Sequence, residues 1–335
     1  MADTPGGKRV QLKSILPLSM PLMIQIFPIY GCNFKCEFCI HGLDRSKHGY
    51  ISDTPVMDMD LYRKIIRDIK ESGQKIKMLR FAAIGEPLMH KNIAEMIKIA
   101  NNADVADSVD IVTNGSLLTH SLSDALINAG LSRLRISVEG LNDKDYEKRC
   151  HCKVDFNEFV KNITYFYKMK TKTEVYIKII DYMVKSKEDR DKFFNIFGPI
   201  SDSIAIEHLT PTIAEIDYAR VSDGMVLDKG QNGEVLLNAK VCPQGFYMMQ
   251  INPDGKVVPC CSMKYPAILG NVAENSVQKI WTGKEFNHFR HKMLKSRLEA
   301  SKVCRECILF RYDLHEEDIL DDAAEDLMRK YQNIY

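Results

Sequence analysis

The chain has 335 residues, 45% of them hydrophobic and 27% charged, with a formal net charge of +1. This composition is typical of a soluble globular protein with a sizeable core. The balanced charge gives no electrostatic reason to expect nucleic acid or an anionic membrane surface as a partner. Near the N-terminus, the apolar run LPLSMPLMIQIF is interrupted by two prolines and is too short to span a bilayer. We therefore expect a cytoplasmic protein.

Strand-like and helix-like segments alternate through the first two-thirds of the sequence. The predicted strands are short, rich in β-branched or apolar residues, and followed by polar or glycine-containing turns. Strand-then-helix order favours parallel strands joined by helical crossovers. An eight-unit barrel needs about 250 residues, and this segment has room for about six units. We predict an α/β fold, a partial (β/α)6 TIM-like barrel over residues 23–210, after an N-terminal extension of residues 1–22. The predicted strands are 23–30, 76–84, 109–114, 134–139, 174–183 and 203–209, and the clearest helices are 61–71, 93–101 and 121–129.

The sequence changes character after about residue 210. Two short strands there flank Asn252-Pro253-Asp254-Gly255, a strong hairpin-turn signal. Half of the ten cysteines lie between Cys242 and Cys307. We predict a small metal-stapled domain over residues 211–312. A C-terminal helix is expected over residues 313–335, facing solvent because it is acidic at its start and basic near its end.

The N-terminal cysteines Cys32, Cys36 and Cys39 occur together as CNFKCEFC. Without a signal peptide, such clusters are more often metal ligands or catalytic thiols than disulfides. Thiolates suit zinc or iron–sulfur clusters. A structural zinc site needs four ligands and would have to recruit His41 or His48. A 4Fe–4S cluster held by only three protein ligands would instead leave one iron open for a small molecule.

A CxxxCxxC motif directly after the first strand of an α/β barrel, with Phe38 before its last cysteine, resembles the radical S-adenosylmethionine (SAM) superfamily. In that family the open iron binds the amino and carboxylate groups of SAM. The reduced cluster cleaves SAM to methionine and a 5′-deoxyadenosyl radical, which abstracts hydrogen. The resemblance implies that Cys32, Cys36 and Cys39 hold this 4Fe–4S cluster. It also implies an external one-electron donor such as flavodoxin or ferredoxin.

Other parts of the resemblance fall at the C-terminal ends of successive strands, where a barrel places its functional groups. The sequence IGEP resembles the family's GGE element. There the glycine allows close approach of the methionine part of SAM, and the carboxylate accepts from its ammonium group. Residues after the third and fourth strands resemble the family's ribose-binding positions. The implied cofactor-binding set is Phe38, Gly85, Glu86, Asn114, Ser137 and Glu139.

A second set of cysteines lies around the predicted hairpin. On ligand chemistry alone it fits either zinc or a second iron–sulfur cluster. The Cys-Pro pair, the NPDGxVxPC hairpin and the CxxC resemble the SPASM domain, or its shortened twitch form, found after some radical SAM barrels. The full domain binds two auxiliary clusters with about seven cysteines, so five are too few. The resemblance implies one auxiliary 4Fe–4S cluster, as in aminocyclitol dehydrogenases, held by Cys242, Cys260, Cys304 and Cys307.

The remaining cysteines are Cys150, Cys152 and Cys261. Cys261 is expected to pack as a small buried hydrophobe, because buried free cysteine is common. Cys150 and Cys152 follow the fourth predicted strand, in a loop expected at the active-site end, where relatives in the family usually carry an Arg-Gly-like pair; a loop cysteine need only be tolerated. The alternative is a thiol that returns a hydrogen atom to a substrate radical, as in radical epimerases. These three and Lys178 are the catalytic candidates. Lys178 either reaches SAM or substrate, or is a solvated lysine on an outward face. Structural roles are expected for His90, Glu207 and His208.

The resemblance implies an enzyme, a radical SAM oxidoreductase or epimerase. Its substrate would be a polar small molecule, such as a sugar or aminocyclitol, with hydrogen abstracted from an unactivated C–H. One alternative is a peptide-modifying radical SAM/SPASM enzyme, in ribosomal peptide or sulfatase maturation. The 22 residues before the first predicted strand leave no room for a peptide-recognition domain there. The other alternative is a zinc-stapled, non-enzymatic binding module.

Overall fold

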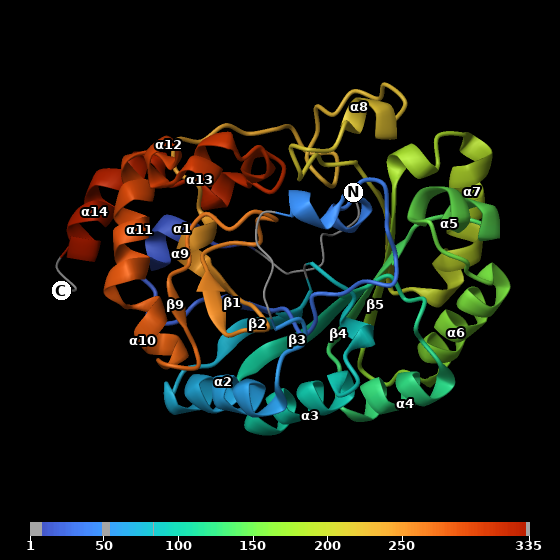
Figure 1. Cartoon of the computed structure of the whole chain (residues 1–335), viewed down its shortest axis with the longest axis horizontal. Coiled ribbons are helices and arrows are strands. Elements are labelled where there is room, and N and C mark those ends of the chain that lie inside the picture. The colour runs from blue at the N-terminus through green and yellow to red at the C-terminus, as the bar shows by residue number, and fades with distance from the viewer. Residues whose placement is uncertain (1–8, 49–53, 83, 333–335) are drawn as a thin grey trace.

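One curved sheet organises the chain (Figure 1). The computed structural model describes residues 9–48, 54–82 and 84–332. Within these residues the sheet has nine strands in the order β6-β5-β4-β3-β2-β1-β7-β8-β9. Its first six strands in sequence are parallel to one another. They are β1 (Met23–Ile26), β2 (Ile76–Phe81), β3 (Ala106–Thr113), β4 (Arg133–Val138), β5 (Glu174–Ile180) and β6 (Ser203–Glu207).

These six strands confirm the predicted partial barrel, although several end earlier than the sequence suggested. The strand predicted over 23–30 ends at Ile26, and that over 174–183 ends at Ile180. Apolar residues that follow them, such as Phe27 and Tyr182, are buried outside the strands. The predicted strands were too long because apolar residues buried in a turn cannot be distinguished, in the sequence, from apolar residues buried in a strand.

Helices cover the outer, convex side of the sheet (Figure 1). Alternate strand residues supply the apolar surface for this packing; Leu134 and Ile136 of β4, for example, are fully buried. The helices begin at polar capping residues, as when the carboxylate of Asp58 accepts from the backbone N–H of Asp60 at 2.8 Å. They are α2 (Met59–Glu71), α3 (Ile93–Ala103), α4 (His120–Asn128), α5 (Asp143–Cys150), α6 (Phe156–Met169) and α7 (Lys187–Phe197).

The C-terminal part of the chain continues the same sheet. Strand β7 (Met248–Ile251) runs parallel to β1, with Gln25 opposite Gln250. The predicted hairpin is confirmed, since β8 (Lys256–Val258) is antiparallel to β7 and Gly255 adopts a φ of +82° in the turn between them. A two-residue strand, β9 (Gly270–Asn271), follows. The cysteine-rich segment is therefore joined through β7 to the strand that precedes the first cysteine loop.

Helices of the C-terminal segment pack beside β7, β8 and β9 (Figure 1). The prediction of one solvent-facing helix over residues 313–335 is wrong. Helix α14 spans only Ala324–Gln332 in the described part of the chain, and its Leu327 and Tyr331 are buried. Acidic residues before it make other contacts: Asp318 pairs with Arg9 at 2.7 Å. The other α-helices of this segment, within the described residues, are α8 (Tyr218–Val221), α9 (Gln244–Tyr247), α10 (Val277–Trp281), α11 (Lys284–Lys295), α12 (Arg297–Ala300) and α13 (Lys302–Glu306).

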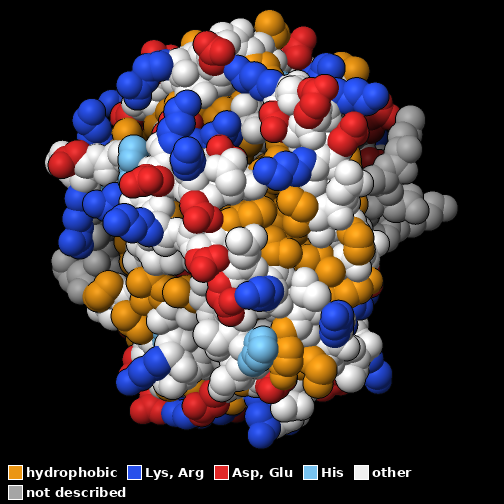
Figure 2. Space-filling model, turned by 90° about the vertical axis from the view of Figure 1, so that its right-hand side faces the viewer, with side chains coloured by type: hydrophobic (Ala, Val, Ile, Leu, Met, Phe, Trp, Pro, Cys, Tyr) orange, Lys and Arg blue, Asp and Glu red, His pale blue; other side chains and the backbone are white. Residues whose placement is uncertain are grey.

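The surface shows mixed charge. On the face drawn in Figure 2, basic and acidic side chains are interspersed with hydrophobic ones, and neither sign covers an extended area. This agrees with the net charge of +1. Among the described residues, no helix combines the length and apolar character needed to cross a membrane.

Candidate cofactor and substrate site

The loop after β1 carries Cys32, Cys36 and Cys39, all as free thiols. A turn brings the last two together, since the backbone N–H of Cys39 donates to the carbonyl of Cys36 at 3.0 Å. Burial raises the pKa of Cys32 to about 12. The pKa of Cys39 is also raised by burial, and that of Cys36 by its contact with Cys150 and by burial. Binding of a metal cluster would therefore release protons from buried thiols. Three sulfur donors in one loop fit an iron–sulfur cluster.

The end of α5 holds this cysteine loop in place. The backbone N–H of Lys35 donates to the carbonyl of Cys150 at 2.9 Å, and that of Glu37 donates to the carbonyl of Arg149 at 3.0 Å. Last-turn carbonyls of a helix lack partners within the helix, so the loop satisfies them. The hydroxyl of Tyr182, just after β5, also donates to the Glu37 carboxylate at 3.3 Å. Two later segments of the barrel thus fix the shape of the loop.

The IGEP turn after β2 packs directly against the start of the same loop. Gly85 has a φ of +133°, and its Cα is so close to the loop that a Cβ would lie 2.2 Å from the carbonyl oxygen of Ile29. The backbone N–H of Glu86 donates to the carbonyl of Gly31 at 2.8 Å. Only glycine fits this position, because both the conformation and the space exclude a side chain.

Glu86 is buried, and donors of the chain itself surround its carboxylate. Its Oε1 accepts from the N–H of Leu88 at 2.9 Å and from the hydroxyl of Thr113 at 2.6 Å, and its Oε2 accepts from the N–H of Asn114 at 2.8 Å. Burial raises the pKa of Glu86, whereas these hydrogen bonds lower it. Glu86 therefore positions the end of β3, and contact with the SAM ammonium stays a prediction.

Asn114 connects the end of β3 to the cysteine loop. Its Nδ2 donates to Oδ1 of Asn33 at 2.9 Å, and Nδ2 of Asn33 donates to the hydroxyl of Ser116 at 2.8 Å. Phe38 lies edge-on to Tyr182, with 6.2 Å between the ring centroids. Ser137 lies opposite Lys178 in the pairing of β4 with β5. The predicted cofactor-binding residues therefore come from successive strand ends, as in a barrel site.

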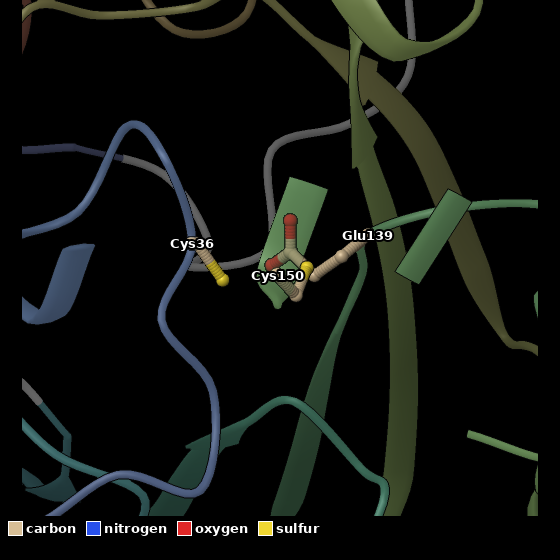
Figure 3. A group of neighbouring side chains, drawn as sticks. All are labelled: Cys36, Glu139 and Cys150. Atoms are coloured by element: carbon tan, nitrogen blue, oxygen red, sulfur yellow. The ribbon is translucent and has the colours of Figure 1, made fainter. Parts of the chain in front are cut away.

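Glu139, Cys36 and Cys150 form a buried group beneath the loop (Figure 3). Their ligand atoms all lie within 4.8 Å of one another. Burial raises the pKa of Glu139 to about 7, although Lys178 and Arg149 act to lower it. Glu139 is therefore a carboxyl group with charge partners on two different elements, close to the cysteine loop.

The expectation that Cys150 lies in a loop is wrong, although the residue does lie at the active-site end of the barrel. Cys150 is the last residue of α5 and is fully buried, with its thiol against Cys36. Cys152 does lie beyond the helix; its thiol approaches the carbonyl oxygen of Tyr146 at 3.9 Å, and burial raises its pKa to about 12. The segment forms helix α5 because Asn142 caps its start and Asp143 and Asp145 lie in its first turn, and the helix ends after Cys150, where His151 adopts a left-handed conformation.

Lys178 faces the inside of the barrel, so the outward, solvated alternative is wrong. Its Nζ donates to Oε2 of Glu207 at 2.5 Å, and its side chain is 17% exposed. The hydroxyl of Tyr176 donates to the other carboxylate oxygen at 2.7 Å. Burial alone would raise the pKa of Glu207, but Lys178 and the hydrogen bonds lower it overall. Glu207 thus holds Lys178 in a charged pair on the concave side.

Two histidines near strand ends differ in their contacts. His90 Nε2 lies 3.1 Å from the carbonyl oxygen of Met57, and its Nδ1 accepts from a backbone N–H, as in a structural role. His208 Nδ1 lies 2.6 Å from Oδ2 of Asp181. Its Nε2 is buried and has no hydrogen-bond partner among the described residues. The Asp181 contact therefore orients the ring and leaves Nε2 available.

The C-terminal segment brings four of its five cysteines to one cavity. Phe289, Met293 and Pro259 supply apolar lining beside them. The fifth, Cys261, directs its thiol to Oε1 of Gln244 at 3.5 Å. Four thiols around one apolar cavity match the donor set of a closed iron–sulfur cluster. The cysteines lining the cavity are Cys242, Cys260, Cys304 and Cys307.

Arg149 was not singled out from the sequence. It contributes to the pKa of Glu139, and its guanidinium lies 5.4 Å from the ring centroid of Tyr182. One of its terminal nitrogens is buried with no hydrogen-bond partner among the described residues. The only signal in the sequence was its position, directly before Cys150, one of the three cysteines outside the two predicted ligand sets.

Comparison with known families identifies both parts of the chain. The model of the radical SAM superfamily matches residues 26–195, just over half of the chain. The model of the SPASM iron–sulfur cluster-binding domain matches residues 242–308. The chain is 32% identical to GTP 3′,8-cyclase of Chlorobaculum tepidum, over 37% of this chain and 34% of that protein. It is 24% identical to the tungsten-containing aldehyde ferredoxin oxidoreductase cofactor-modifying protein of Pyrococcus furiosus, over 83% and 85%.

Solved structures share the fold at low sequence identity. BtrN, crystallised with AdoMet and 2-DOIA, has a TM-score of 0.54 and 17% identity, covering 86% of this chain and 93% of BtrN. Streptococcus suis SuiB bound to SAM has a TM-score of 0.61 and 18% identity, covering 90% and 74%. The expected likeness to the butirosin radical SAM dehydrogenase is confirmed at the level of the fold. Family membership implies SAM, a 4Fe–4S cluster and auxiliary iron–sulfur binding as the cofactor chemistry. The chain belongs to the radical SAM superfamily and carries a C-terminal SPASM domain.

Proposed function

We propose that this chain is a radical SAM oxidoreductase that dehydrogenates a polar small molecule, such as a sugar, bound on the concave side of the sheet. The cofactors would supply a 5′-deoxyadenosyl radical for hydrogen abstraction and a second site to accept an electron. In this proposal Cys32, Cys36 and Cys39 hold the SAM-binding cluster. Residues 23–210 form the catalytic barrel, residues 211–312 the auxiliary domain and 313–335 a C-terminal segment. A flavodoxin or ferredoxin would supply the first electron.

The observation that carries this proposal is the cavity lined by Cys242, Cys260, Cys304 and Cys307. Four thiols can close the coordination of a cluster and leave it no open iron, which suits electron transfer. Oxidation of an alcohol to a ketone removes two electrons, and hydrogen abstraction accounts for only one. The cavity therefore offers a location for the acceptor of the second electron.

Oxidation of an alcohol also requires a group that takes the hydroxyl proton. His208 fits this requirement, because Asp181 binds its Nδ1 and the buried Nε2 has no partner within the described residues. A carboxylate on one ring nitrogen fixes the tautomer and stabilises the imidazolium that forms when the other nitrogen accepts a proton. Lys178, held by Glu207, supplies a hydrogen-bond donor on the same side of the sheet.

Epimerisation is the second candidate outcome, and Cys261 favours it. Burial and Asp313 raise the pKa of Cys261 to about 12, and Arg80 of β2 acts to lower it. A thiol that stays protonated could return its hydrogen atom to a substrate radical. Cys150 and Cys152 have contacts with Cys36 and with the carbonyl of Tyr146, respectively.

A peptide substrate is the alternative that the relatives support. The chain is 23% identical to PqqA peptide cyclase of Bradyrhizobium diazoefficiens, over 81% of this chain and 76% of that protein. SuiB has been crystallised with its precursor peptide. The buried polar groups on the concave side, including Glu207 and Lys178, favour a compact polar substrate over an extended chain.

The test uses reduced, anaerobically prepared enzyme with SAM in deuterated water. Dehydrogenation predicts a ketone with one 5′-deoxyadenosine per turnover and no solvent deuterium at the reacting carbon. Epimerisation predicts deuterium in the product and loss of that product in a Cys261→Ala variant. Failure to form 5′-deoxyadenosine from SAM under any reducing condition would sink the proposal.

A further inference from the structure

A polar row crosses the inside of the barrel. Neighbouring strands pair these residues in register, from β7 through β1, β2, β3 and β4 to β5. Residues on either side of the row, such as Leu79 and Phe81 of β2, are fully buried towards the helices. Because strand side chains alternate, the row itself lies on the concave side. Its members are Gln250, Gln25, Arg80, Asp110, Arg133 and Glu174.

The cations of this row share one buried acid. Asp110 is fully buried, and its Oδ2 lies 3.4 Å from Nη2 of Arg80 and 3.5 Å from Nη1 of Arg133. Arg133 also pairs with Glu174 at 2.8 Å, whereas Nε of Arg80 is buried without a hydrogen-bond partner in the described part of the chain. Within the described residues, the ion pair of Arg80 is therefore a long contact with a carboxylate that Arg133 also approaches.

Arg135, two residues further along β4, adds a cation with no acid of its own. Its guanidinium lies 5.1 Å from the ring centroid of Tyr176, the residue opposite it on β5. Among the described residues its side chain forms no ion pair, and its Nε is buried without a hydrogen-bond partner. A guanidinium stays charged, so a partly buried one without an anion beside it is destabilising.

Arg80 and Arg135 lie on the same side of the sheet: Arg80 is opposite Asp110, Asp110 is opposite Arg133, and Arg135 follows Arg133 by two residues on β4. The pKa of Arg80 is lowered, first by burial and then by Arg135, with Asp110 acting in the opposite direction. The Arg80 side chain is 17% exposed, so this part of the barrel is not sealed. An anion bound between the two guanidinium groups would offset the repulsion between their charges. It would also accept hydrogen bonds from their N–H groups.

We propose that Arg80 and Arg135 bind an anionic group of the substrate, a carboxylate or a phosphate, on the concave side of the barrel. This inference rests on the proposed function and narrows its substrate to a sugar acid or sugar phosphate. Arginine presents a planar fork of donors that matches both groups. An aminocyclitol fits less well, because its ammonium group would meet two cations.

The experiment measures binding separately from turnover. Anaerobic holoenzyme with SAM is titrated calorimetrically with glucose, glucosamine, glucuronate and glucose 6-phosphate, and inorganic phosphate is added as competitor. We expect glucuronate or glucose 6-phosphate to bind at least about tenfold more tightly than glucose or glucosamine, and phosphate to weaken that binding. Reductive cleavage of SAM, followed as 5′-deoxyadenosine, is measured on the same samples.

Variants separate an anion site from a structural role of the arginine. Arg135→Gln is expected to weaken binding of the anionic sugar at least about tenfold, while Arg135→Lys, which keeps the charge, retains part of it. Lys77→Gln removes a cation whose side chain is 72% exposed and should leave binding unchanged. Iron content and melting temperature are compared for all variants.

Two results would overturn the inference. One is equal affinity of the wild-type enzyme for all four sugars. This result does not depend on whether any variant folds. The other is an Arg135→Gln enzyme with a lower melting temperature and wild-type affinity, as a purely structural contact with Tyr176 would give. Anion preference without any cleavage of SAM would support the anion site and contradict the proposed function, so the two failures are distinguishable.

Discussion

Gly85 and the carbonyl of Ile29 are in such close contact that the turn after β2 and the chain leaving β1 form one unit; a Cβ on Gly85 would lie 2.2 Å from that oxygen. Gly85→Ala therefore combines a steric clash with a φ of +133°. We expect the free energy of unfolding to fall by about 3 kcal/mol or more. Urea denaturation, followed by circular dichroism, measures it.

The matched control for that prediction is Gly73→Ala. Gly73 has a φ of +68°, but a Cβ there would meet no atom within 4 Å. Gly73→Ala should therefore lower the free energy of unfolding by about 1 kcal/mol, through the strained backbone conformation alone. Equal losses for the two variants would show that contact with Ile29 does not decide the choice of glycine at position 85.

Removal of one thiol from the first loop should delete one cluster. Cys39→Ala is expected to reduce bound iron by about half, from about eight to about four atoms per chain. It should also abolish 5′-deoxyadenosine formation. Iron is counted colorimetrically after anaerobic reconstitution. Cys152→Ala serves as control, because that thiol lies beyond α5 near a carbonyl of Tyr146; loss of iron in both variants would contradict the assignment.

The same comparison in the C-terminal segment tests the auxiliary site. Cys307→Ala removes a thiol that lines the cysteine cavity, so about half of the iron should be lost. Cleavage of SAM without substrate should persist, because the first loop is intact. Cys261→Ala should keep its iron, since that thiol contacts Gln244. Retention of all iron in Cys307→Ala would exclude the four-cysteine set.

Glu207→Gln should destabilise the barrel by leaving Lys178 without its charge partner. Because Lys178 is 17% exposed, we expect a loss of about 2–3 kcal/mol, below the range for a fully buried pair. The pKa of Glu207 is lowered by folding, so its contribution is present above the ordinary carboxyl pKa and fades as pH falls through the lowered value. The difference between wild type and variant should therefore shrink at acidic pH.

Denaturation series at several pH values measure this dependence. Glu158→Gln provides a control, because its pair with Lys161 spans 3.5 Å between side chains that are 56% and 72% exposed. Such a surface pair contributes little at any pH. A wild-type advantage at position 207 that grows as pH falls would contradict the charged Lys178–Glu207 pair.

The order of strands and helices was predictable because buried parallel strands and amphipathic helices leave strong periodic signals. The cysteine sets were predictable because ligand spacing is local. The contact of Cys150 with Cys36 was not, since it depends on where α5 ends relative to a loop more than a hundred positions earlier. Arg80 and Arg135 were not singled out for a similar reason: the strand register that aligns Arg80, Asp110 and Arg133 in one row, with Arg135 two residues further along β4, does not follow from sequence spacing. Register also decided which way Lys178 points.

The pairing of β7 with β1 has a consequence for fragments of this chain that lack the C-terminal segment. Strand β1 has β2 on one side and β7 on the other, so it presents no unpaired backbone. A fragment that ended before β7 would expose the hydrogen-bonding groups of the very strand that leads into the first cysteine loop. Such an open edge invites pairing with other chains. The C-terminal segment thus covers this edge of β1, and one continuous sheet connects the two parts of the chain that carry the thiol sets.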